Sequence, residues 1–124
     1  MHYKLVKRKN PQSPLSEKYY ANAVNAGKLT IRDFANEITG RSSLTLGDIE
    51  NVLENFLDEL PVFLKLGLSI QLGDFCTLRL SLSSKGSDTP EEFRADMIKG
   101  AKVVFTPGVQ LKNALKTISY EAQK

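Results

Sequence analysis

The sequence predicts an α+β fold, and three patterns in its 124 residues carry this prediction. Two segments, 30–38 and 45–64, each begin with a capping threonine and then repeat apolar residues at helical spacing. From residue 68 the apolar period changes to two, which is typical of strands. A final helical pattern starts at Pro107, so the predicted order is two helices, a three-stranded antiparallel sheet and a closing helix.

The first 28 residues are predicted to form an N-terminal extension (1–28) to a domain that spans residues 29–124. Residues 2–9 mix apolar and basic side chains, which is a weak strand signal. The segment 10–14 contains two prolines and is expected to interrupt that strand, because proline is excluded from helix interiors and central strands. Residues 18–21 are compatible with one short, extra edge strand.

Both helices that follow carry start and stop signals. Thr30 and Asp33 form a capping-box pair, in which the threonine hydroxyl accepts from the Asp33 N–H and the carboxylate reaches back. The second helix repeats this pattern at its start. Gly40 and Gly67 are expected to end the two helices, and Pro61 is expected to kink the second one in its last turns.

The apolar face of the second helix is wider than one small chain needs to cover its own core. We therefore predict that this helix also packs against a partner subunit, with its acidic face turned to solvent. The residues predicted to build the core of the dimer come from the helix and from the sheet: Leu53, Phe56, Leu57, Leu60, Phe75 and Phe105.

The change of period predicts a β-hairpin in the middle of the chain. Apolar residues alternate over 68–72 and again over 78–82, and the dipeptide Gly73-Asp74 between them is a turn signal. The single cysteine, Cys76, lies in this pattern. We expect it to be a buried thiol, and it leaves no possibility of a disulfide within the chain.

The rest of the chain is expected to leave the core and return to it. The segment 81–87 is polar, and Pro90 with the two glutamates after it predicts a helix start with one or two turns over 90–98. A short strand at 103–105 brings the chain back to the sheet. The closing helix is expected over 107–118.

The net charge of +3 is mild, but it is unevenly distributed along the chain. Residues 1–29 hold six basic and one acidic side chain, whereas residues 30–124 hold eleven basic and thirteen acidic ones. A basic segment of this kind is either a nucleic-acid contact or a solubilising tail. If the protein binds DNA, the predicted phosphate contacts are Lys4, Lys7, Arg8 and Lys9, together with Lys85, Arg94, Lys99 and Lys102.

No catalytic or metal-binding constellation is predicted. One histidine and one cysteine leave no cysteine-built zinc site and no plausible base for a serine nucleophile. The carboxylates at helical spacing indicate a solvent-exposed helix face. The sequence has no glycine-rich phosphate-binding loop. We therefore predict a protein with no enzymatic activity, metal, cofactor or small-molecule substrate. No secretory or membrane-spanning segment is predicted, which favours the cytoplasm.

Two short motifs carry a resemblance to a known family. The first is the hairpin turn Asp74-Phe75-Cys76-Thr77-Leu78, and the second is the set Phe105, Gly108, Leu111 and Lys112. With the order of helices and strands over residues 29–118, they resemble the HU/integration host factor family of bacterial histone-like proteins. The resemblance implies an intertwined dimer whose two β-arms reach around DNA and insert a proline in the minor groove.

The chain departs from that family in its arm and at its start. The arm region, 81–100, carries four acidic side chains against three basic ones and is shortened. Pro90 has the flanks of a helix start, so we do not expect it to act as the intercalating wedge. The basic lead-in resembles the HU-like proteins of the Bacteroides group, which combine an N-terminal extension with a shortened arm.

The function implied by this resemblance is that of a non-enzymatic architectural protein of the nucleoid, which binds double-stranded DNA as a homodimer. Binding is expected to use mainly phosphate contacts, with little sequence selectivity. The alternative is an HU-derived protein–protein interaction module with weak or no DNA binding, which the acidic arm favours. Whether the partner subunit is an identical or a homologous chain stays open.

Overall fold

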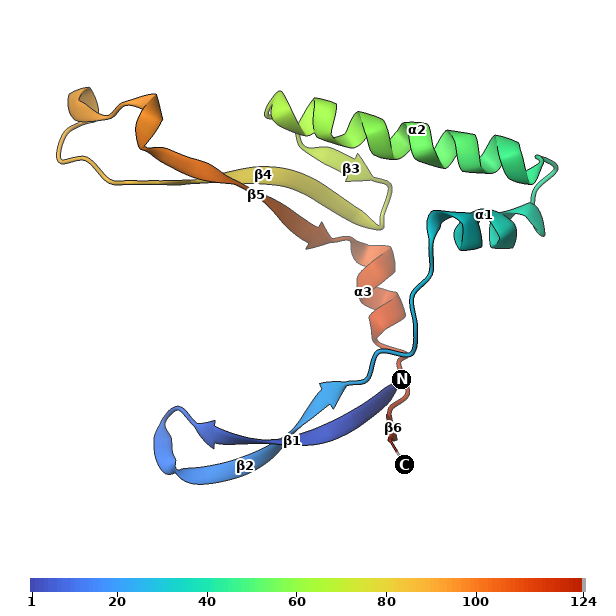
Figure 1. Ribbon diagram of the computed structural model, residues 1–124, viewed down its shortest axis with the longest axis horizontal. Helices are drawn as coiled ribbons and strands as arrows, with labels where there is room; N and C mark the ends of the chain where they lie inside the picture. The colour runs from blue at the N-terminus through green and yellow to red at the C-terminus, as the bar shows by residue number, and fades with distance from the viewer. Residues whose placement is uncertain (124) are drawn as a thin grey trace.

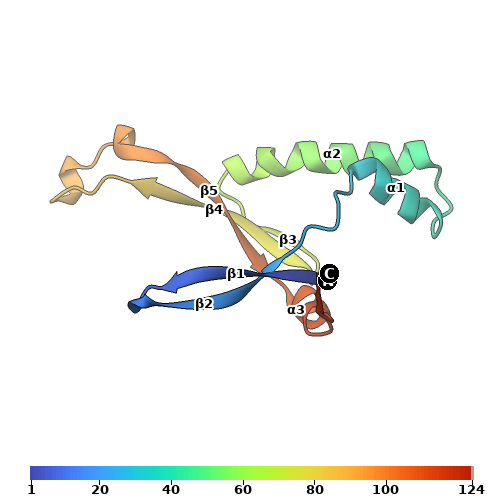
Figure 2. The same ribbon diagram turned by 60° about the horizontal axis from the view of Figure 1, so that its bottom comes forward.

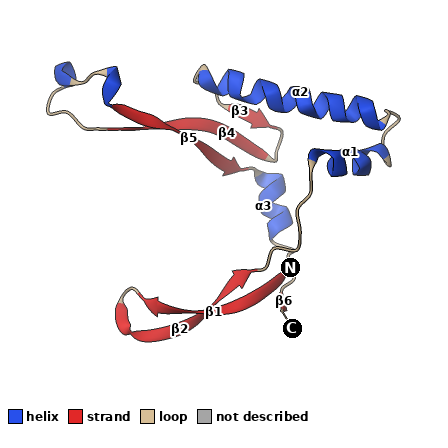
Figure 3. Ribbon diagram, viewed as in Figure 1, coloured by secondary structure: helices blue, strands red, loops and turns tan. Residues whose placement is uncertain are grey.

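The computed structural model describes residues 1–123, and the side chains of all of these except residues 10, 13 and 14. Within this range, helices and strands form a mixed α+β fold with two three-stranded sheets (Figure 1). One sheet joins two strands from the start of the chain, within residues 2–23, to a short strand at its end, and the other contains three strands from residues 70–107. In Figure 3, the first two α-helices lie on the side of the second sheet, and the last α-helix lies between the two sheets. The α+β class predicted from the sequence is confirmed, whereas the first sheet goes well beyond the one extra strand that was predicted.

β1 (His2–Asn10) and β2 (Ser13–Ala23) form a long antiparallel hairpin. β6 (Glu121–Ala122) pairs in parallel with β1, so the two ends of the chain meet in this sheet. The strand predicted at 2–9 is confirmed, but the short strand predicted at 18–21 is wrong in length. The predicted interruption is present but shorter than expected: Pro11 lies in a turn at residues 11–12, whereas residue 14 already belongs to β2. β2 is an edge strand, and an edge tolerates proline.

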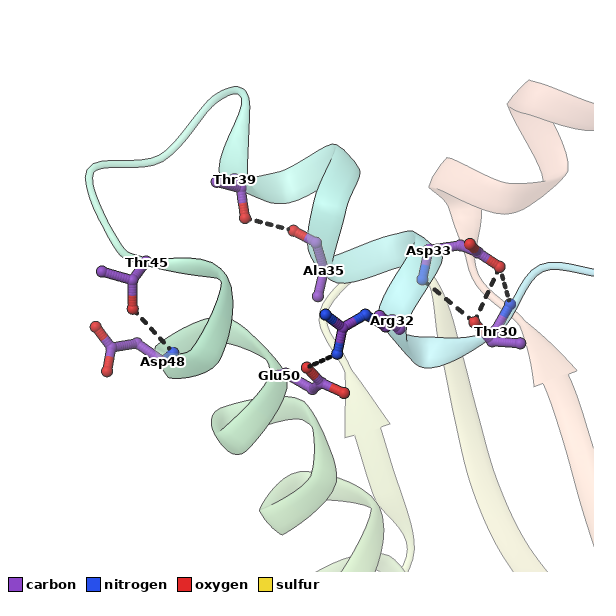
Figure 4. Close-up of polar contacts among 8 residues, drawn as sticks. All are labelled: Thr30, Arg32, Asp33, Ala35, Thr39, Thr45, Asp48 and Glu50. Atoms are coloured by element: carbon purple, nitrogen blue, oxygen red, sulfur yellow. Dashed lines mark hydrogen bonds and ion pairs between the residues drawn. The ribbon is translucent and has the colours of Figure 1, made fainter.

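α1 (Ile31–Thr39) begins with the predicted capping box, which Figure 4 shows in detail. The Thr30 hydroxyl oxygen accepts from the Asp33 N–H at 3.3 Å. In return, the Asp33 carboxylate accepts from the Thr30 N–H at 2.8 Å and from the Thr30 hydroxyl at 2.9 Å. These two bonds, the backbone one first, hold the pKa of Asp33 below its ordinary value of 3.8, because both stabilise the charged carboxylate.

The lowered pKa of Asp33 makes a pH-dependent contribution to stability. Because the folded pKa lies below the unfolded value, the contribution is present above about pH 4 and is lost as the pH falls through the folded pKa. We expect Asp33→Asn to be less stable than the wild type at pH 6, and the difference to shrink below pH 4. Thermal unfolding of both proteins across this range measures it.

Asp48→Asn is the matched control for this experiment, because Asp48 occupies the same position in the second helix. In residues 1–123 its carboxylate accepts no hydrogen bond, although its N–H donates to the Thr45 hydroxyl at 3.2 Å. A difference between wild type and Asp33→Asn that does not change with pH would contradict the prediction.

α2 (Leu46–Lys65) is the longest helix, and it continues through Pro61 without a break. Gly67, with a φ of +83°, follows its end, as predicted. α1 and α2 pack against each other, and each contributes a buried apolar residue, Ala35 and Ile49. An ion pair between Arg32 and Glu50, at 3.4 Å, also joins the two helices (Figure 4).

The second sheet contains β3 (Ile70–Leu72), β4 (Cys76–Ser84) and β5 (Ile98–Pro107), all antiparallel. Gly73 has a φ of +56°, a left-handed conformation that suits glycine, so the predicted turn between β3 and β4 is confirmed. Cys76 is buried, as expected.

The ends of β4 and β5 extend beyond the body of the protein as an arm (Figure 1). Pairing continues out to Ser84 opposite Ile98, so the strands predicted at 78–82 and 103–105 are both too short. The sequence predicted one or two helical turns over 90–98. The structure instead has two separate 3₁₀ turns at the end of the arm, Pro90–Glu92 and Ala95–Met97.

α3 (Val109–Leu115) closes the second sheet and is shorter than the predicted helix over 107–118. Pro107 is the last residue of β5 and Gly108 is the N-terminal cap, so the predicted helix start is wrong by two residues. Gly108 approaches the β3–β4 turn closely: its N–H donates to the Phe75 carbonyl at 2.7 Å, and a Cβ at this position would overlap the Asp74 carbonyl.

A single copy of the chain does not enclose a large hydrophobic core. Figures 1 and 2 show the β1–β2 hairpin and the β4–β5 arm projecting on the same side of the body. Only four hydrophobic residues of the described part are buried, a core far smaller than a chain of this length needs: Ala35, Ile49, Leu64 and Cys76.

Candidate nucleic-acid interface

The basic residues predicted at the N-terminus lie on the β1–β2 hairpin, and strand geometry divides them between its two faces. Successive side chains of a strand point to opposite faces. Lys4 and Arg8 therefore share one face, and Lys7 and Lys9 share the other. The four residues predicted as one cluster are not one cluster in the structure.

Two of these four side chains have partners on the adjacent strand. Lys7 forms an ion pair with Glu17 at 2.8 Å between Nζ and a carboxylate oxygen. Arg8 donates to the Asn22 amide oxygen at 2.7 Å, a bond that leaves its charge uncompensated. In residues 1–123, neither Lys4 nor Lys9 belongs to an ion pair, and both are exposed.

Three predicted cations lie along the β4–β5 arm. Lys85 follows β4, and its N–H donates to the Met97 carbonyl at 2.9 Å. Lys102 lies opposite Ser81, and Lys99 sits at the bulge near the outer end of β5. No ion pair involves these three lysines within the described residues, and all are exposed.

The end of the arm is more acidic than its base. Arg94 lies between the two 3₁₀ turns and pairs with Asp96 at 3.6 Å, so its charge is partly compensated. Three further carboxylates belong to this end of the arm: Asp88, Glu91 and Glu92. Pro90 opens a 3₁₀ turn, in agreement with its interpretation as a helix start, and this end is not a flat basic ribbon.

Sequence reasoning missed two exposed cations that the strand register brings to these surfaces. Lys18 lies directly opposite Arg8 on the hairpin. Arg79 shares a face with Ser81, which lies opposite Lys102 on the arm. Neither residue stands in a basic run of the sequence, so only the register could have identified them.

The residues predicted to form the dimer core remain largely uncovered in the single chain. Phe56 and Leu57 of α2 are 44% and 40% exposed, while Leu53 and Leu60 are half-buried. Phe75, in the turn before β4, and Phe105 of β5 are 46% and 50% exposed, and their rings meet edge to face at 6.4 Å between centroids. Large apolar side chains of this kind are normally covered in a folded protein.

Residues 1–123 contain no group of three histidine, cysteine or acidic side chains that could hold a metal ion. In the same range, no helix has the length and the apolar composition needed to cross a membrane.

Comparisons with known proteins agree with this arrangement. A family described as "HU domain fused to wHTH, Ig, or Glycine-rich motif" (HU-HIG) matches residues 1–122. The fold is similar to the crystal structure of a "putative bacterial DNA binding protein" from Bacteroides vulgatus ATCC 8482, with a TM-score of 0.64 and 11% sequence identity. The match covers 98% of this chain but only 47% of that one, so this chain spans about half the length of its structural relative. No curated protein matches the chain.

Proposed function

The chain belongs to the HU-HIG family, and from this premise we propose that it is a non-enzymatic architectural protein that binds double-stranded DNA as a dimer. The observation that carries the proposal is this family match over residues 1–122, on a fold whose two projecting hairpins both carry exposed basic residues. Within the family we place the chain near the HU-like proteins of the Bacteroides group, because of its extension and short arm. The proposed location is the nucleoid, in the cytoplasm.

Dimerisation is supported by the apolar surface that one chain leaves uncovered. Side chains on α2 and on the second sheet are exposed although they are large and apolar, among them Phe56, Phe63, Phe75 and Phe105. A second copy that covers this surface would supply the core that the single chain lacks.

Phosphate contact is supported by the kind of residues on the two hairpins. Contacts from lysine and arginine to phosphates do not read base edges, so they give affinity but little sequence selectivity. Most of the cations predicted for this role are exposed and, in residues 1–123, belong to no ion pair.

An alternative is an HU-derived protein–protein interaction module with weak or no DNA affinity. The acidic end of the arm supports it, because Asp88, Glu91 and Glu92 would repel phosphates. A mobility-shift titration against intact, bent and nicked duplexes at low salt separates the two functions. No shift at high micromolar protein would favour the interaction module.

The salt dependence of binding tests the electrostatic mechanism. We expect log K to fall linearly with log salt, and each phosphate neutralised to add about 0.9 to the slope. Four contacts per complex would thus give a slope of about 3.6. Fluorescence anisotropy with duplexes of two unrelated sequences measures it, and the affinities for both should be similar. Affinity that is indifferent to salt would contradict this mechanism.

A further inference from the structure

The two faces of the β1–β2 hairpin differ sharply in charge. The Lys4 face consists of Lys4, Val6, Arg8, Lys18, Tyr20 and Asn22, which the strand register places together. The Lys7 face consists of Tyr3, Leu5, Lys7, Lys9, Glu17 and Tyr19. The first carries three cations and no acid, whereas the second carries two cations and one acid.

We propose that the Lys4 face is the surface of the hairpin that contacts the phosphates of duplex DNA, and that the Lys7 face does not contact them. This inference rests on the proposed function and goes beyond it, because it gives the hairpin an orientation on DNA. It also adds Lys18 to the contact and removes Lys7 and Lys9.

The arrangement of the Lys4 face suits a polyanion. Arg8 and Lys18 occupy directly opposite strand positions, and none of the residues that the register places on this face is acidic. The Arg8–Asn22 bond of 2.7 Å holds the guanidinium over this face and directs it toward Lys4, the cross-strand partner of Asn22. Repulsion among the three cations is a cost that a bound anion would remove.

Lys4 extends the same charged row toward the base of the hairpin. Its backbone lies four residues from that of Arg8, roughly 13 Å along a strand, and the Arg8 side chain reaches back over part of this distance. Duplex DNA carries one negative charge per roughly 1.7 Å of its axis, so separate phosphates are available to both residues. The exposed ring of Tyr20 lies between these charges, and its hydroxyl is a further donor to a phosphate.

The Glu121 carboxylate lies near the base of this face. Glu121 of β6 lies 3.9 Å from the His2 ring nitrogen, beside the strand position that begins the row. Arg8 lies six residues further along β1, roughly 20 Å away, so Glu121 does not compensate its charge.

The Lys7 face is poorly suited to phosphate. The Lys7–Glu17 ion pair, at 2.8 Å, neutralises one cation, and the Glu17 carboxylate would repel a phosphate near Lys9, which lies directly opposite it. Toward its base this face is apolar, with Leu5 and Tyr19 about two-thirds exposed. DNA phosphates would therefore find few favourable contacts on the Lys7 face.

Matched double variants of the full chain test the proposal. Lys4→Gln/Arg8→Gln and Lys7→Gln/Lys9→Gln each remove two positive charges from the same strand, so they have equal net charge. Binding to a duplex of about 30 base pairs is measured by anisotropy over a range of salt concentrations, after circular dichroism has verified the fold. A third variant, Lys18→Gln, tests the cation on β2.

For each subunit whose hairpin contacts the duplex, we expect the Lys4/Arg8 variant to lose about 1.8 from the salt slope and Lys18→Gln about 0.9. The Lys7/Lys9 variant should lose almost nothing. Equal losses in the two double variants, a larger loss in the Lys7/Lys9 variant, or no loss in either would overturn this inference while wild-type binding stands. A wild type that binds no DNA would overturn the proposed function, and the inference with it.

Discussion

Replacement of Phe56 by alanine is expected to destabilise the protein by about 3–5 kcal/mol, if the exposed face of α2 is the core of a dimer. The ring is 44% exposed in the single chain, where its truncation alone would cost much less. The excess over that smaller cost is the part contributed by the partner subunit. Because a typical domain has only 5–15 kcal/mol of stability, the loss is large enough to populate unfolded chains.

Concentration dependence distinguishes a dimer core from an ordinary surface position. Unfolding of a dimer shifts to higher temperature as the protein concentration rises. We therefore expect wild-type thermal unfolding to depend on concentration, and sedimentation of Phe56→Ala to move toward the single chain. Denaturant unfolding of both proteins at several concentrations gives the free-energy difference.

Leu15→Ala is the matched control, because it also truncates a large apolar side chain. Leu15 lies on the β1–β2 hairpin and is fully exposed, so its truncation should change stability by no more than about 0.5 kcal/mol. The proposed dimer would be wrong if Phe56→Ala behaved like this control and the wild type sedimented as a compact single chain.

The features that could be predicted from the sequence are the ones that depend on neighbouring residues. The Thr30–Asp33 capping box needs only four consecutive residues, and the structure has it as predicted. The same holds for the turn at Gly73, where a left-handed residue is required between two apolar runs. The wide apolar face of α2 could also be predicted from the sequence. That a partner subunit covers this face stays a prediction.

The features that were missed depend on pairing between distant parts of the chain. The β1–β6 pairing joins residues more than a hundred positions apart, and no local pattern marks it. Apolar alternation ends at Leu82, and beyond it Ser83 and Ser84 pair with Gly100 and Ile98, so no apolar pattern marked this outer part of the arm. The strand register brings Lys18 opposite Arg8, a placement that charge counting along the chain cannot give.

The structure explains why residue 108 is a glycine, which the sequence analysis identified only as part of a motif. Gly108 links the end of β5 to the start of α3, beneath the β3–β4 turn. The Gly108 N–H donates to the Phe75 carbonyl at 2.7 Å, and the Gln110 N–H donates to the Asp74 carbonyl at 3.0 Å. The turn therefore caps the helix, and this contact requires the two backbones to approach more closely than a side chain permits.

Gly108→Ala is accordingly expected to destabilise the protein by roughly 3 kcal/mol or more, because the added methyl group would overlap the Asp74 carbonyl, and a backbone cannot rotate away as a side chain can. Urea unfolding measures this loss. Gly47→Ala is the matched control: nothing lies near the position of its Cβ, in the first turn of α2, and alanine there should raise stability by up to about 1 kcal/mol. Equal stability of the two variants would contradict the prediction, and would mean that the close approach of Gly108 to the Asp74 carbonyl contributes nothing to stability.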